Sequence, residues 1–317
     1  MSMRRVDSPE SKSSMEYQDD KETKETKEAK TQSQLMLAIL EGNLIAAEKQ
    51  IQEDKTALLV KSSVRHYSQR DIEATPLQLA LAMQDVDLAI IIIKYLYEID
   101  PQQIIQQITE QFPHGWQFDE EKQLQEDMLA LRRAVQGIER DGHEMAAIAQ
   151  FKQYIDDKAK NPLKSGKFFD FRALLYAFKL RNEYFDRFGG KDSYKNILYW
   201  TQVVGYLERL LPPFYAFALC DRIDLLVLNK LEVHRDASLR YSPETSFFPA
   251  KVSVSRSGLG YDYAIEGGRI SRSHRFDVEK FEKLINYFRQ FNESNEKQFL
   301  ELIHDHGKHW LSQCNIL

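Results

Sequence analysis

The segment TPLQLALAMQDVDLAIIIIKYL, residues 75–96, constrains the fold of this 317-residue chain more than any other. Thr75-Pro76 favours the start of a helix, because proline in the first helical turn has a helical φ and needs no N–H. Gln84-Asp85 then predicts a turn, and a second, almost wholly apolar helix follows to Tyr97. Because a helix that is apolar on all sides must be covered on all sides, the segment predicts one helix-turn-helix layer within a stack.

A second interpretation of residues 90–93 stays open, since four consecutive isoleucines are also typical of a buried β-strand. The Thr-Pro-Leu-x-Leu-Ala start and the length of the apolar run favour the helix instead. A strand at this position would remove the layer, and with it the expectation of a stacked fold.

A helix pair of the same kind lies 42 residues earlier in the chain. Residues 35–40 predict a short helix that ends at a glycine, and residues 44–51 predict the next helix. The matching positions are Ala38 with Ala80, and Gly42-Asn43 with Gln84-Asp85. Residues 60–74, between the two pairs, predict an extended finger. Two layers are fewer than the roughly three that a stack needs, so the rest of the chain must supply the missing cover.

The composition excludes several classes of protein. A formal net charge of −5 gives no general attraction for nucleic acid or for an anionic membrane. Two cysteines cannot form a disulfide framework, which favours a reducing compartment. No run approaches the roughly 18 apolar residues of a membrane span, and the N-terminus lacks the apolar segment of a secretory signal. We therefore expect a protein that acts in a cytosol, without a membrane segment, a nucleic-acid partner or a cofactor.

Residues 1–33 predict a disordered charged tail. Residues 21–30, KETKETKEAK, alternate in charge and contain no large apolar side chain. Such a segment buries too little surface to offset the entropy that ordering removes. A frayed charged helix, held by Glu/Lys pairs, is the alternative.

Residues 116–317 keep a helical pattern but lose the repeat of residues 34–115. Apolar residues three and four positions apart predict a series of helices. The first two helices are marked by the stripes Leu124, Met128, Leu131, Val135 and Ile138, and Met145, Ile148, Phe151 and Ile155. The others are expected over 171–188, 197–211, 214–231, 278–288 and 299–310. A loop insertion at about 234–275 interrupts this series with two candidate strands, 251–255 and 261–265. The expected fold is mainly α, with helical layers packed on a C-terminal helical domain that carries a small β-hairpin.

A basic loop within this insertion is one candidate site. Arg256, Arg269, Arg272, His274 and Arg275 lie among serines and glycines, and such loops can hold a phosphate or an acidic peptide. A solvated loop, whose arginines pair with nearby carboxylates, is the alternative. The carboxylates in question are Asp262, Glu266 and Asp277.

The remaining candidates favour structural roles. His306 and His309 are three residues apart and could face one metal, but His306 shares an apolar stripe with Phe299 and Trp310. Cys220 lies in an apolar helix, where cysteine usually acts as a small hydrophobic residue. No H-E-x-x-H, G-x-S-x-G or paired C-x-x-C motif is present. We therefore predict no catalytic residue and no metal site.

The segments LAILEGNLIAAEKQI (37–51) and 75–96 resemble the degenerate ankyrin repeats of effector proteins that intracellular bacteria deliver into host cells by type IV secretion. The resemblance covers roughly a quarter of the chain. Gln78 and Gln84 depart from it, since they replace the usual histidine and glycine. The resemblance implies passage from a bacterial cytoplasm into a host cytosol, and action by binding a protein partner.

The predicted function is that of a non-enzymatic protein–protein interaction module. Loops on a rigid scaffold commonly carry such a function. The candidate contact residues are Arg65, His66, Tyr67, Gln69 and Arg70, exposed by the finger, and Arg256, Arg269 and Arg272 in the basic loop. The partner is expected to be a host protein or another bacterial effector. The alternative is an effector enzyme, with a catalytic site in 116–317 and an ankyrin-like part that selects the substrate.

Overall fold

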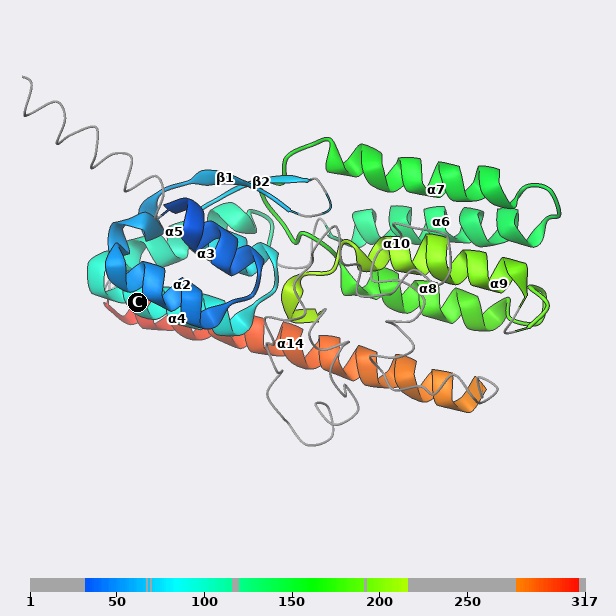
Figure 1. The fold of residues 1–317 in the computed structure, drawn as a ribbon. Coiled ribbons are helices and arrows are strands. Elements are labelled where there is room, and N and C mark those ends of the chain that lie inside the picture. The colour runs from blue at the N-terminus through cyan, green and yellow to red at the C-terminus, as the bar shows by residue number, and fades with distance from the viewer. Residues whose placement is uncertain are drawn as a thin grey trace, which may run out of the picture.

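The structure, a computed structural model, describes residues 32–66, 68, 70–115, 120–190, 193–215 and 278–313. The described chain is mostly helical and contains one two-stranded sheet, as the expected mainly α fold requires. Layered helices occupy one end of the molecule and a helix bundle the other, and the long helix α14 (Val278–Gln313) runs along both (Figure 1). Within the described residues, no helix combines the length and the apolar character needed to cross a membrane.

Helix α4 lies at the centre of the layered end, because it packs against α2, α3, α5, the 3-10 helix η1 and α14. The elements of this end are a helix over 32–40, α2 (Leu44–Glu53), η1 (Lys55–Leu59), α3 (Pro76–Ala82), α4 (Val86–Ile99) and α5 (Pro101–Gln111). The isoleucine run 90–93 is therefore helical, and the strand interpretation is wrong. Ile90 remains exposed, so α4 is covered on most of its surface but not on all of it.

Helix α3 begins where Thr75-Pro76 predicts. Thr75 and Gln78 form a reciprocal capping box, in which Thr75 Oγ1 accepts the Gln78 N–H and Gln78 Oε1 accepts the Thr75 N–H. Thr75 Oγ1 also donates to Gln107 Oε1 of α5 at 2.6 Å. The cap thus starts α3 and joins it to α5.

The turns that close the two helix pairs have the same geometry, 42 residues apart. Gly42 (φ 65°) and Gln84 (φ 56°) both take the left-handed conformation. Each turn also has the same two backbone hydrogen bonds. In the first turn, the Gly42 N–H donates to Ile39 O and the Asn43 N–H donates to Ala38 O. In the second turn, the Gln84 N–H donates to Leu81 O and the Asp85 N–H donates to Ala80 O. This is the Schellman arrangement that ends many helices. Asn43 and Asp85 then cap α2 and α4.

A β-hairpin occupies the segment where an extended finger is expected. Strand β1 (Ser62–Arg65) pairs antiparallel with β2 (Asp71–Ala74), and Val64 lies opposite Ile72. Residues 251–265, where the candidate strands are predicted, lie outside the described residues.

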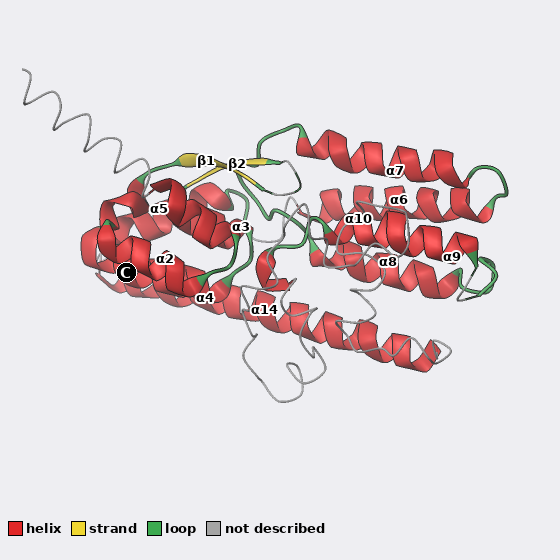
Figure 2. Cartoon of the chain, viewed as in Figure 1, coloured by secondary structure: helices red, strands yellow, loops and turns green. Residues whose placement is uncertain are grey.

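The bundle is built around α6, which packs against α7, α8 and α9. Its elements are α6 (Glu120–Glu139), α7 (Glu144–Ala159), α8 (Phe171–Glu183), α9 (Tyr194–Tyr199), the π-helical turn η2 (Trp200–Val204) and α10 (Gly205–Glu208), shown as helices in Figure 2. The predicted stripes are buried or half-buried here, except that Met145 is 61% exposed. Met145 lies in the first turn of α7, before the helix reaches α6.

Helix α14 replaces two shorter helices expected over 278–288 and 299–310. The intervening sequence contains no glycine or proline to end a helix. Its Asn292 and Asn295 are buried and hydrogen-bonded to Tyr215. These two polar residues are therefore buried contacts of one continuous helix.

Candidate functional site

Strand β1 has an open edge. The His66 N–H donates to Arg70 O, so His66 and Arg70 form a hydrogen-bonded pair. In an antiparallel ladder such pairs alternate with pairs that are not hydrogen-bonded. The backbone N–H and C=O of Val64 therefore point toward β2, and those of Ser63 and Arg65 point away from it. No hydrogen bond in the described part of the chain reaches those outward groups of Ser63 or Arg65. The edge of β1 can therefore accept another strand.

The outer edge of β2 is occupied. Leu163 lies beside it, donating to Asp71 O at 2.8 Å and accepting the Glu73 N–H at 3.0 Å. The hairpin is thus covered on one side and open on the other.

A groove of about 670 Å³ lies along β1. Met36, Leu37, Ala57 and Val60 supply apolar side chains to it, and Ser62, Ser63 and Arg65 supply the strand edge. Six of the ten exposed large apolar side chains in the described residues lie between positions 37 and 99, and Leu37 and Val60 are two of them. Apolar surface is therefore concentrated on the end of the molecule that carries the open strand.

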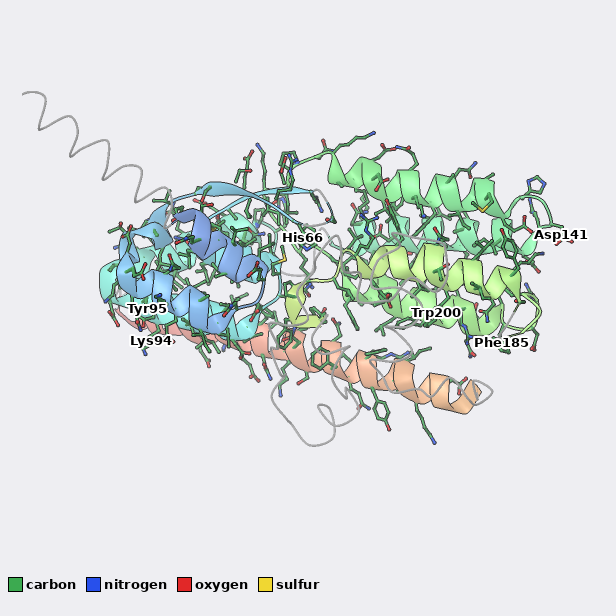
Figure 3. The ribbon with its side chains drawn as sticks, in the orientation of Figure 1. His66, Lys94, Tyr95, Asp141, Phe185 and Trp200 are labelled. Carbon is green, nitrogen blue, oxygen red and sulfur yellow. The ribbon has the colours of Figure 1, made fainter. Side chains whose placement is uncertain are left out.

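The hairpin tip packs into the molecule. His66, expected to be exposed by the finger, is fully buried between the layered end and the bundle (Figure 3). Its ring lies 4.2 Å from that of Phe168, and its Nδ1 accepts the Ser68 N–H at 3.1 Å. Burial, together with the nearby Arg70 charge, holds the pKa of His66 well below its usual range, so the ring is neutral. His66 is a structural anchor, because the tip rests on the loop before α8.

The other predicted finger residues divide into two groups. Arg65 is exposed and makes a two-pronged ion pair with Asp71, whereas Arg70 is half-buried and donates from Nε to Asn161 O at 3.3 Å. Five predicted contact residues lie outside the described residues: Tyr67, Gln69, Arg256, Arg269 and Arg272.

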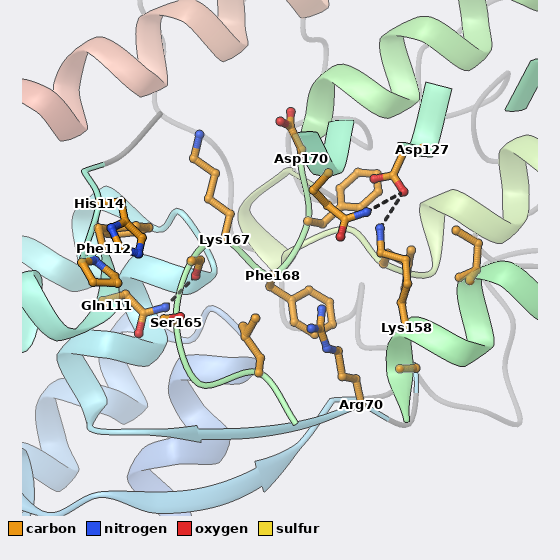
Figure 4. Close-up of a pocket in the computed structure, with 18 of the residues that line it drawn as sticks. Arg70, Gln111, Phe112, His114, Asp127, Lys158, Ser165, Lys167, Phe168 and Asp170 are labelled. Carbon is orange, nitrogen blue, oxygen red and sulfur yellow. Dashed lines mark hydrogen bonds and ion pairs between the residues drawn. The ribbon is translucent and has the colours of Figure 1, made fainter. Parts of the chain in front are cut away.

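A cavity of about 240 Å³ separates the hairpin tip and the end of α5 from the bundle (Figure 4). Its apolar lining comprises Phe112, Ile155, Leu163, Phe168, Phe169, Leu207 and Leu210. The Gln111 backbone and side chain both bond Gly166, at 2.7 and 2.6 Å, which fixes one wall. Because Phe112 is buried beside this wall, the end of α5 packs onto the loop that leads to α8, as the large apolar residues there predict.

The charged side chains on the cavity wall are mostly neutralised. Asp127 Oδ1 accepts from Lys158 Nζ at 2.6 Å and from the Tyr154 hydroxyl at 2.7 Å. Desolvation and the Asp127 hydrogen bond raise the pKa of Tyr154 above its usual value. Asp170 is paired with Arg172, and Lys167 lies 3.4 Å from Glu296. Arg70 has no carboxylate partner among the described residues.

The described residues contain no cluster of three or more His, Cys, Asp or Glu side chains that would hold a metal ion. Comparison with known protein families, with curated proteins and with solved structures found no match. The chemistry of this chain must therefore be argued from its own surfaces.

Sequence reasoning placed an extended finger over residues 60–74 but did not predict the hairpin, its open edge or the cavity. Val64 and Ile72 alternate with polar neighbours, and this period of two is the signal that would have predicted the strands. The cavity has no comparable signal, because its walls come from segments more than 100 residues apart.

Proposed function

We propose that this chain is a protein-binding module that takes an extended segment of a partner protein onto strand β1. The open edge of β1 beside an apolar groove is the observation that carries the proposal. In strand addition, backbone hydrogen bonds supply affinity and pockets for alternate side chains supply specificity. Ser63 and Arg65 offer the backbone groups, and the groove at Leu37 and Val60 offers the apolar contact.

We further propose that the two helix pairs are degenerate ankyrin-like layers. The matched turns at Gly42 and Gln84, with the same φ region and the same backbone bonds, support this assignment. A rigid layered support suits a binding module, because it holds the strand edge in place before the partner arrives.

The proposed partner is a host protein or another bacterial effector, met after type IV secretion into a host cytosol. This part of the proposal rests on the resemblance of residues 37–51 and 75–96 to such effectors. It determines where the partner is sought, in host-cell and bacterial lysates, and not how it binds.

Site-directed photo-crosslinking tests the surface. A photoreactive phenylalanine analogue replaces Leu37 in the groove, and in a matched control it replaces Leu129 on α6; these side chains are 46% and 49% exposed. We expect a crosslinked adduct from position 37 that is missing from position 129. Equal labelling at both positions would contradict the proposal.

The strand-addition geometry has its own test. Ser63→Pro removes the outward N–H of β1 without removing a bond to β2, whereas Ser63→Ala keeps that N–H. The adduct from position 37 should fall about tenfold in the proline variant, as expected when a backbone hydrogen bond and its neighbours are lost. It should be unchanged in the alanine variant. Loss in both variants would assign the contact to the serine hydroxyl and would refute strand addition.

A further inference from the structure

We propose that the cavity between the hairpin tip and the bundle binds a small carboxylate with an apolar body, and that Arg70 receives the carboxylate. This site is separate from the β1 edge and does not depend on the proposed protein partner. Figure 4 shows Arg70 extending toward Phe168, with Lys158 and its partner Asp127 to the right of them in this view, and all four residues line the cavity.

The charge balance of the cavity wall points to an anionic ligand. Lys158 is neutralised by Asp127, Lys167 lies beside Glu296, and Asp170 is held by Arg172. Among the described wall residues, Arg70 is left as a cation without a carboxylate. A half-buried charge of this kind is costly unless it is paired, and an anion entering the cavity would pair it.

The contacts of Arg70 leave its outer nitrogens available. Nε donates to Asn161 O at 3.3 Å, and the guanidinium carbon lies 5.8 Å from the centre of the Phe168 ring. No described hydrogen bond uses its two terminal nitrogens. Burial also lowers the pKa of Arg70, as expected for a cation without a counter-charge. A guanidinium fixed at Nε and against a ring presents its remaining donors in a geometry that suits a carboxylate.

The size and lining of the cavity define the rest of the ligand. A volume of about 240 Å³ corresponds to roughly eight water molecules at ~30 Å³ each, which suits a molecule such as a benzoate. The surrounding phenylalanine, leucine and isoleucine side chains favour a hydrocarbon body. One unneutralised cation balances one negative charge, which favours a monocarboxylate over a phosphate dianion.

Fluorine NMR titration of the full chain tests the site with 4-fluorobenzoate as the probe. We expect binding with a dissociation constant of about 1 mM or tighter, a range set by the ligand's few atoms. The neutral 4-fluorobenzamide should bind at least about tenfold more weakly. Inorganic phosphate should not displace 4-fluorobenzoate.

Three variants complete the test. Arg70→Gln should weaken 4-fluorobenzoate binding by about tenfold or more. Arg65→Gln removes an arginine of the same hairpin that already pairs with Asp71, and should leave binding unchanged. Ala159→Phe fills the cavity without changing charge, and should abolish binding even if Arg70→Gln does not fold. The proposal is overturned by undetectable binding to the native chain, equal binding of the amide, displacement by phosphate, or unchanged binding in Arg70→Gln or Ala159→Phe.

Discussion

Gln84 occupies a position where most turns of this type use glycine. Its φ of 56° costs a non-glycine residue about 1 kcal/mol. The buried side chain offsets this cost, because Gln84 Nε2 donates to Phe169 O at 2.7 Å and its Oε1 lies 3.2 Å from the Tyr215 hydroxyl. The matching turn uses Gly42, which takes the same left-handed conformation without this cost. The use of glutamine instead of glycine at this turn thus has a structural reason.

Replacing Gln84 with glycine should destabilise the protein although it relaxes the backbone. Two buried hydrogen bonds are lost and Phe169 O is left without this donor, so we expect a net loss of about 1–2 kcal/mol in the free energy of unfolding. Urea denaturation measures the change. A Gln84→Gly variant as stable as the native chain would show that the side chain contributes little.

Glu208 should make stability fall as pH rises. Its carboxylate is fully buried and has no hydrogen-bond partner in the part of the chain that the structure describes, and desolvation raises its pKa well above 4.5. Below pH 4.5 it is protonated in both the folded and the unfolded chain. Between this value and the raised pKa, unfolding releases a proton, so the free energy of unfolding falls by up to about 1.4 kcal/mol per pH unit.

Glu208→Gln removes this dependence and should therefore stabilise the protein at pH 7 and above. Thermal unfolding of the native chain and the variant across pH 5–8 measures the difference. Glu282→Gln, at an exposed position on α14, is the matched control and should follow the native curve. Parallel curves of stability against pH for Glu208→Gln and the native chain would show that Glu208 does not cause the fall in stability.

At the scale of elements, Gly137 sets the distance between α6 and α7. A Cβ placed on Gly137 would lie 2.3 Å from the Cβ of Ala147, which no structure tolerates without movement. In an exposed helix, alanine is about 1 kcal/mol better than glycine. Here we expect Gly137→Ala to lower the free energy of unfolding by about 1–3 kcal/mol, because the helices must separate.

Chemical denaturation tests this close approach, with the double variant Gly137→Ala/Ala147→Gly as the control. The second change removes the methyl group that the first would meet, so it should restore most of the lost stability. A double variant as unstable as Gly137→Ala alone would show that the clash between the Cβ atoms at positions 137 and 147 is not the cause of the lost stability.

Local signals predicted most of the elements. The helix start at Thr75-Pro76, the glycine at position 42 and the apolar stripe through Leu131 depend on neighbours within a few residues, and the structure has each of them. The errors came where local signals conflict with packing. Two shorter helices were expected where α14 is continuous, and between them Asn292 and Asn295 are hydrogen-bonded to Tyr215, more than 70 residues away.

At the scale of the molecule, α14 and the hairpin tip tie the two ends together. α14 packs against α8 in the bundle and against α4 and α5 in the layered end. Asn295 Nδ2 donates to the Tyr215 hydroxyl and to Gln84 O, at 2.9 and 3.3 Å. The sequence alone does not predict these contacts, nor the cavity near Arg70, because they depend on how distant segments meet. Among the candidate residues on the finger, His66 was wrongly expected at the surface.

A double-mutant cycle should detect this tie. Gln84→Ala and Asn295→Ala lie 211 positions apart in the chain yet share one network, so we expect a coupling energy of about 0.5–3 kcal/mol in unfolding. Gln84→Ala combined with Lys297→Ala, an exposed neighbour on α14, should be additive. Additivity in both cycles would mean that the Gln84 and Asn295 side chains do not interact through the Tyr215 hydroxyl.

Residue-resolved hydrogen exchange measures the open edge of β1 most directly. In the free chain, we expect the amides of Ser63 and Arg65 to exchange at least about tenfold faster than those of Val64 and His66, which face β2. A bound partner segment should slow exchange at Ser63 and Arg65. Equal protection of all four amides in the free chain, or no added protection when the partner binds, would contradict the proposed mode of binding.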